Sequence, residues 1–142
     1  MSRVNARMAG RVRRRANGCC EYCQSQERLI AEDFTVDHVI PSTKGGSDEF
    51  ENLALCCYLC NPTKGARTEA RNPDTGELVP LLNPRRQWWA DHFAWSDDGL
   101  RIVGRTAIGR ATVSALRLNR PSLLVSRQTW VQWGVHPPVP GR

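Results

Sequence analysis

The chain has 142 residues, a formal net charge of +6 and 40% hydrophobic residues. This length predicts one domain, or one domain with a smaller appendage. No apolar run approaches the roughly 18 residues that a helix needs to span a bilayer, so we expect no membrane partner. The Arg-rich N-terminus lacks the apolar stretch of a secretory signal, and we therefore expect a cytoplasmic protein.

The charges are distributed unevenly along the chain. Every Asp and Glu lies between Glu21 and Asp98, so both flanks are purely cationic, and their charge comes from arginine alone. Guanidinium groups pair with phosphate oxygens through two parallel hydrogen bonds. This distribution favours a polyanionic partner such as nucleic acid, although a solvated surface would give the same pattern.

The first half of the chain predicts short elements separated by turns. Residues 2–16 should form a basic helix with Val4, Met8 and Val12 on one face. Residues 29–40 read as a strand pair or strand–turn–strand that Pro41 ends, and Gly45-Gly46 marks the bend of the following loop. A short helix capped by Asn61, with proline at its first position, should run to about residue 67.

The second half is less clearly patterned. We expect a strand at 78–82, a helix that starts at Asn83-Pro84 and carries Trp88 and Trp89, and a hairpin at 95–103. Thr106 should cap a helix over 107–118, and a last helix should cover 123–133 before a frayed, Pro-rich end from residue 136. Trp88, Trp89 and Trp95 are expected to form a small core rather than platforms for stacked bases, and Trp130 and Trp133 to cap that core or to meet a partner.

Six cysteines without a secretion signal favour metal binding over disulfides. Cys19 and Cys56 have no cysteine three residues further on and are left as spares. The other four form two Cys-x-x-Cys turns, Cys20/Cys23 and Cys57/Cys60. Each turn can present two thiolates to one tetrahedral Zn²⁺, and four thiolates leave no open position. We therefore predict a structural zinc; buried or disulfide-linked cysteines are the alternative.

The stretch 36–65, VDHVIPSTKGGSDEFENLALCCYLCNPTKG, combines an Asp-His pair, a Gly-Gly turn, an Asn-Leu pair and the second cysteine turn. With the upstream cysteine turn it closely resembles the HNH nuclease family, in the zinc-stapled form common in bacteria and their phages. The resemblance covers residues 16–67, about a third of the chain. It implies a ββα-metal arrangement, in which a strand and a helix grip one divalent metal ion.

The resemblance also implies roles for individual residues. Asp37 and Asn61 would bind Mg²⁺ or Mn²⁺, His38 would be the general base, and Asn52 would tie the loop in place and orient His38. Many members have histidine where this chain has Asn61, and a neutral amide implies modest metal affinity. Adjacent Asp and His side chains point to opposite faces of a regular strand, so the backbone must bend there for both to reach one phosphate. The residues expected to contact nucleic acid are Lys64, Arg67, Arg14 and Arg15.

These observations predict an α+β protein with a zinc-stapled HNH nuclease domain over residues 1–71. A basic, mostly helical extension would cover residues 72–142. The expected function is metal-dependent hydrolysis of phosphodiester bonds in DNA. The alternatives are a zinc-dependent nucleic-acid-binding protein that does not cut, and a nuclease that cleaves RNA. A single active site cuts one strand per visit, so double-strand breaks would need a homodimer or two visits.

Overall fold

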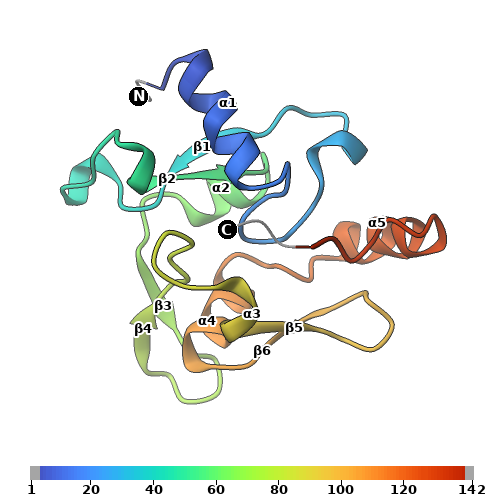
Figure 1. Cartoon of the computed structure of the whole chain (residues 1–142). Coiled ribbons are helices and arrows are strands. Elements are labelled where there is room, and N and C mark those ends of the chain that lie inside the picture. The colour runs from blue at the N-terminus through green and yellow to red at the C-terminus, as the bar shows by residue number, and fades with distance from the viewer. Residues whose placement is uncertain (1–3, 140–142) are drawn as a thin grey trace.

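The computed structural model describes residues 4–139 and shows small helices and two-stranded sheets, an α+β fold (Figure 1). The expected helix start at residue 2, and the part of the expected frayed end beyond residue 139, lie outside the described residues. At His136 that expectation is wrong, because this residue is buried and its Nε2 lies 3.0 Å from the Gly99 carbonyl oxygen. No helix in the described part has the length and apolar character needed to span a membrane. The helices and strands are α1 (Ala6–Arg15), β1 (Thr35–His38), β2 (Leu53–Cys56), α2 (Cys60–Lys64), β3 (Glu69–Arg71), β4 (Leu78–Pro80), α3 (Trp89–His92), β5 (Phe93–Trp95), β6 (Ile102–Gly104), α4 (Ala107–Ala115) and α5 (Pro121–Gln132).

The helix α1 forms as its sequence predicts. The side chain of Asn5 accepts a hydrogen bond from the amide of Met8 at 2.9 Å, which satisfies one of the free N–H groups of the first turn. Val12 is fully buried, and Val4 and Met8 pack against the same core. The apolar stripe therefore faces the protein, and most of the arginines face outward or along the rim.

The strand pair of the nuclease-like half is β1 with β2, in antiparallel register from Thr35↔Cys56 to His38↔Leu53. The expectation of a strand pair within residues 29–40 is wrong, because only Thr35–His38 forms a strand there. Its partner β2 is buried along its whole length. A short strand buried on both faces has no alternating pattern, which is why sequence periodicity missed it.

The extension is a mixture of hairpins and helices rather than mostly helical (Figure 1). The predicted start of a helix at Asn83 is wrong, because the Asn83 side chain accepts from the amide of Arg85 and closes a turn; only Trp89–His92 of the predicted segment is helical. The hairpin β5–β6 and the Thr106 cap are confirmed, since the Thr106 hydroxyl accepts from the Gly109 amide at 3.0 Å. The expected boundary after residue 71 falls between the two strands of the β3–β4 hairpin.

One hydrophobic core includes side chains from both halves of the chain. Trp89 is buried in it and donates its indole N–H to the carbonyl of Tyr22 at 3.0 Å. Trp88 is exposed, so the expected core of Trp88, Trp89 and Trp95 holds for only part of the set. Gln26 adds a further tie by donating to the carbonyl of Val135 at 2.7 Å. The extension is thus packed directly onto the segment that carries the cysteine turns.

Candidate metal centre and active site

The four cysteines of the two Cys-x-x-Cys turns form one buried cluster. Their sulfur atoms all lie within 4.8 Å of one another, and the Sγ atoms of Cys23 and Cys57 are 3.7 Å apart. A tetrahedral zinc with Zn–S bonds of about 2.3 Å places its sulfurs about 3.8 Å apart, so the donor set fits zinc. The amide of Cys60 also points at Cys57 Sγ, at 3.3 Å, as expected where a sulfur carries negative charge. The spares Cys19 and Cys56 are buried but lie outside the cluster.

The residue between the first pair of cysteines anchors the cluster to its surroundings. One Glu21 carboxylate oxygen accepts from the amide of Leu55 in β2 at 2.8 Å, and the carboxylate forms an ion pair with Arg85 of the extension. Burial raises the pKa of Glu21, while Arg85 and the Leu55 amide oppose this rise. The first cysteine turn is therefore tied to a strand on one side and to the extension on the other.

The helix α2 begins within the second cysteine turn and lies against one face of β1. Thr35 and Asp37 point to this face, because Asn61 donates its amide to Thr35 Oγ1 at 2.7 Å and Lys64 donates to Asp37. The helix starts at Cys60 with Leu59 as its N-cap, so the expected cap at Asn61 is wrong. Asn61 instead uses its side chain to hold the helix to the strand.

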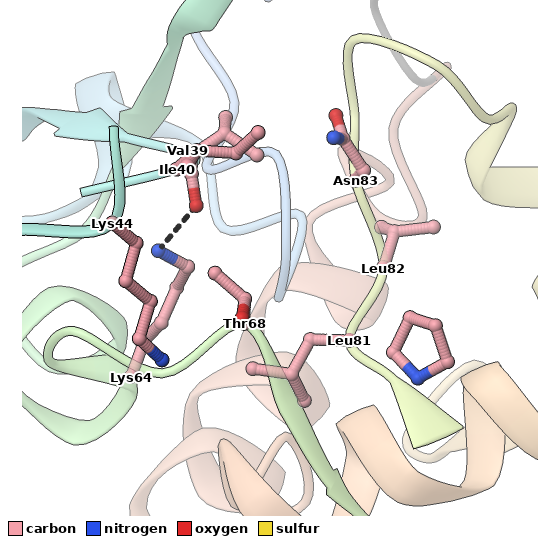
Figure 2. A pocket seen from close by; sticks show the side chains of 9 residues that line it. Val39, Ile40, Lys44, Lys64, Thr68, Leu81, Leu82 and Asn83 are labelled. Atoms are coloured by element: carbon pink, nitrogen blue, oxygen red, sulfur yellow. Dashed lines mark hydrogen bonds between the residues drawn. The ribbon is translucent and has the colours of Figure 1, made fainter. Parts of the chain in front are cut away.

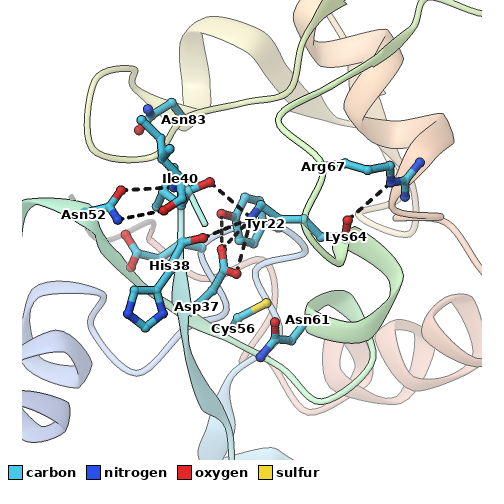
Figure 3. Close-up of polar contacts among 12 residues, drawn as sticks. Tyr22, Asp37, His38, Ile40, Asn52, Cys56, Asn61, Lys64, Arg67 and Asn83 are labelled. Carbon is cyan, nitrogen blue, oxygen red and sulfur yellow. Dashed lines mark hydrogen bonds and ion pairs between the residues drawn. The ribbon is translucent and has the colours of Figure 1, made fainter. Parts of the chain in front are cut away.

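Asp37 is buried, with 4% of its surface exposed, and its carboxylate oxygens already have partners (Figure 3). The Tyr22 hydroxyl donates to Oδ2 at 2.8 Å, and the Lys64 ammonium lies 3.1 Å from the same oxygen. Burial raises the pKa of Asp37, and the Lys64 charge opposes this rise. The ammonium stands where a divalent ion bound to Asp37 would need to be. In this arrangement Asp37 is therefore not free to bind a divalent ion.

His38 lies on the other side of the strand. In Figure 3 its ring points away from the Asp37 carboxylate. The pairing of β1 with β2 continues regularly through His38↔Leu53, so the expected bend between residues 37 and 38 is absent. The structure therefore brings Asp37 and Asn61 to the α2 side of β1, and leaves His38 on the opposite side.

His38 forms an ion-pair contact with Asp48, which sequence reasoning did not single out. Its Nε2 atom is 2.7 Å from Asp48 Oδ1, and the Asp48 side chain is half exposed. A carboxylate can only accept a hydrogen bond, so Nε2 carries the proton. In the neutral ring this leaves Nδ1 with a free lone pair, the form in which an imidazole can accept a proton. Asp48 lies ten residues after His38 in a turn-rich loop, where no local sequence signal indicates the pairing.

The loop that carries Asp48 is held by Asn52. Its side-chain amide donates to the carbonyls of Ile40 and Ser47 at 2.9 and 2.7 Å, and its oxygen accepts from the Ile40 amide at 3.0 Å. A Cβ atom on Gly46 would lie 1.6 Å from the Ile40 carbonyl oxygen, so only glycine allows this close approach. These contacts agree with the supporting role expected for Asn52.

A comparison with family models gave a match to HNH endonuclease over residues 20–67. This segment is therefore similar to the HNH endonuclease family. The match contains both cysteine turns, β1, β2 and α2, and it ends before the extension. Searches of the curated proteins and of the solved structures gave no match. The family implies a nuclease with a nucleic-acid substrate, and the HNH segment spans about a third of the chain.

Two residues expected to contact nucleic acid use their charged groups for internal contacts, and one of them, Lys64, is buried. The Lys64 side chain is 1% exposed and donates to the carbonyls of His38 and Val39, at 3.3 Å each, besides its ion pair with Asp37. Arg15 donates to the carbonyls of Phe50 and Leu53, and burial lowers its pKa to about 10. Lys64 is therefore not available to a phosphate, and the half-buried Arg15 is held by backbone oxygen atoms.

The other two expected contacts are exposed. Arg14 faces solvent on α1. Arg67 is exposed as well, but its guanidinium donates to the carbonyls of Lys64, Thr63 and Ala115, at 3.2, 2.6 and 3.1 Å. Arg67 therefore closes the end of α2 against α4, and Arg14 is the freer of the two to meet a phosphate.

A cavity of about 260 Å³ lies next to Lys64 and between the HNH segment and the extension (Figure 2). Its walls are largely apolar, with Val39, Leu81 and Leu82 among them. His38, Asp48 and Asn61 are absent from its lining. The cavity is therefore separate from the residues expected to carry the chemistry.

The cysteine cluster gives a first prediction. Cys20→Ala or Cys57→Ala should abolish zinc binding and lower the melting temperature strongly, because three thiolates cannot complete the tetrahedral site. Cys19→Ala and Cys56→Ala remove an adjacent buried cysteine and should retain zinc. Metal content after gel filtration, measured by mass spectrometry, distinguishes the two pairs. Equal zinc content in all four variants would contradict the assignment.

A second prediction concerns the loop. Asn52→Ala removes three hydrogen bonds to the backbone, two of them to the partly buried groups of Ile40, and should lower the free energy of unfolding by about 1–3 kcal/mol. Ser47→Ala is the control, because its hydroxyl contacts only the exposed amide of Glu49. Urea unfolding of the zinc-loaded proteins measures the difference. The loop assignment fails if both variants unfold at the wild-type urea concentration.

Proposed function

We propose that this protein is an endonuclease that hydrolyses phosphodiester bonds in DNA. The observation that carries the proposal is the His38–Asp48 pair, which lies within the HNH segment and leaves one imidazole nitrogen free to accept a proton. Support for a nucleic-acid substrate comes from the family match and from the arginines of both flanks. DNA rather than RNA is the proposed substrate.

In the proposed reaction, His38 Nδ1 takes a proton from a water molecule as the water oxygen attacks phosphorus. The bond from phosphorus to the 3′ oxygen breaks, and that oxygen gains a proton from solvent. The products are a 5′-phosphate and a 3′-hydroxyl. Asp48 keeps the imidazole in the required tautomer and balances the positive charge that develops on the ring.

We also propose a requirement for Mg²⁺ or Mn²⁺, because a divalent ion neutralises charge on the phosphate and on the departing oxygen. Asn61 is the expected ligand whose side-chain oxygen has no internal partner among the contacts of residues 4–139. Asp37 can join it only if Lys64 moves away. The Asp37–Lys64 pair is thus the observation in favour of the second candidate, a protein that binds nucleic acid without cutting it.

The proposal predicts that His38→Ala loses nicking activity by about 10²–10⁴-fold and keeps its affinity for DNA. The assay incubates both proteins with plasmid DNA, single-stranded DNA and RNA, each in Mg²⁺, Mn²⁺ and EDTA. His92→Gln serves as the control, because His92 lies outside the HNH segment and its ring contacts the Thr106 hydroxyl of the extension. Equal nicking by wild type and His38→Ala would contradict the proposal that His38 is the general base. Binding without any cutting by the wild type would establish the second candidate.

Asp48 gives a separate prediction. Asp48→Asn should lower kcat by at least about tenfold with little change in KM, because an amide can turn its NH₂ toward Nε2 and favour the unproductive tautomer. Glu49→Gln neutralises the neighbouring carboxylate and changes the net charge by the same amount as Asp48→Asn, so it should behave like wild type. If the two variants have the same kcat, Asp48 does not position His38.

A further inference from the structure

Two arginines near the C-terminus are buried without a carboxylate partner. Arg120, at the N-cap of α5, is 9% exposed, and Arg127, within α5, is fully buried. The ion pairs found in residues 4–139 include neither of them. The other buried charges in that range are Glu21 and Asp37 with Lys64, and each of these does have an oppositely charged partner. An uncompensated buried charge is costly, so the two guanidinium groups call for a counter-charge.

Both arginines lie at the cysteine cluster. Arg120 Nη2 donates to the Leu116 carbonyl at 2.7 Å and lies 3.9 Å from Cys60 Sγ. Arg127 Nη2 is 3.4 Å from the carbonyl of Cys23.

The remaining partners of Arg127 carry no formal charge. Its guanidinium donates to the carbonyls of Leu118 and Leu100, at 2.8 and 3.0 Å, and to Asn119 Oδ1 at 3.2 Å. Arg120 Nη1 and Arg127 Nε are buried without a hydrogen-bond partner among the described residues. Neutral oxygens satisfy hydrogen bonds but do not cancel charge, so the compensation must come from elsewhere.

The charge of the zinc-loaded cluster is equal in size and opposite in sign to that of the two arginines. Four thiolates around one Zn²⁺ carry a net charge of −2, and two guanidinium groups carry +2. We infer that Arg120 and Arg127 are the counter-charges of the zinc–thiolate centre. The HNH segment supplies the ligands, and the extension supplies the charge that allows them to be buried.

This arrangement couples zinc binding to the docking of α5. Zinc holds the four thiolates in place, and the thiolates stabilise the buried guanidinium groups; the arginines in turn stabilise the charged form of the ligands. Because coupling free energies are reciprocal, weakening either partner weakens the other by the same amount. The inference concerns zinc affinity and does not depend on the proposed nuclease activity.

A purely packing role for the two arginines makes a different prediction. If they served only to satisfy backbone carbonyls, any loss of stability would be equal with and without zinc, and zinc affinity of the folded protein would not change. Lysine keeps the charge but forms fewer of the carbonyl bonds, whereas methionine removes the charge and keeps much of the side-chain volume. The two substitutions therefore separate the two roles.

The test compares Arg120→Met and Arg127→Met with the matching Arg→Lys variants, in full-length protein. Competition with a chromophoric chelator measures zinc affinity, and the charge-transfer absorption of the Co²⁺-substituted proteins reports the four-thiolate geometry. We expect the Met variants to lose about 10–100-fold in zinc affinity and the Lys variants to lose much less. The control is Arg101→Met, an exposed arginine with the same change in net charge.

Wild-type zinc affinity in both Met variants would overturn the inference. If the Met variants do not fold with excess zinc, the Lys variants decide. Recovery of folding and zinc binding supports charge compensation, and equal failure contradicts it.

The wild type offers an independent readout, since all five tryptophans lie at residue 88 or later. Zinc removal by a chelator under reducing conditions should shift tryptophan emission to longer wavelength as zinc leaves. Zinc loss with unchanged emission would show that the extension is not coupled to the cluster.

Discussion

The position of α2 depends on sulfur atoms that come from turns 34 residues apart in the chain. A helix of five residues has too little hydrogen bonding to be stable alone, and its place against β1 must be imposed by something else. The thiolate cluster does this at the first turn of the helix. Asn61 and Lys64 then extend the contact along the strand, to Thr35 and Asp37. The face of β1 that carries Asp37 is thus defined by the metal centre.

Charge balance links this centre to the rest of the molecule. The Glu21 carboxylate in the first cysteine turn is neutralised by Arg85 of the extension. The Asp37 carboxylate on β1 is neutralised by Lys64 of α2. In the arrangement that we infer, the negative charge of the zinc–thiolate centre is balanced by Arg120 at the N-cap of α5 and by Arg127 within α5. Such buried pairs contribute little net stability compared with apolar packing, but removing one member leaves a costly charge. They therefore favour one arrangement of the two halves over others.

Features governed by local rules were predictable from the sequence, and features governed by long-range register were not. The cysteine spacing, the Thr106 cap and the β5–β6 hairpin each depend on a few neighbouring residues. The pairing of β1 with β2 joins residues 15 or more positions apart, and β2 is buried along its whole length without an alternating pattern. That register decides which face Asp37 and His38 occupy, and hence that Lys64 is internal and that Asp48 meets His38.

Lys64 occupies the Asp37 carboxylate that a divalent ion would need as a ligand. An ammonium and a divalent ion repel each other and compete for one carboxylate, so an ion that binds Asp37 must displace Lys64. The displaced ammonium has other acceptors at hand, because it already donates to the carbonyls of His38 and Val39. The exchange therefore leaves the ammonium hydrogen-bonded, but it removes the Asp37 carboxylate that balances its buried charge. The free-energy change of this exchange depends on how tightly Asn61 and the phosphate hold the incoming ion. Metal-dependent cleavage by this fold would require the exchange to be favourable.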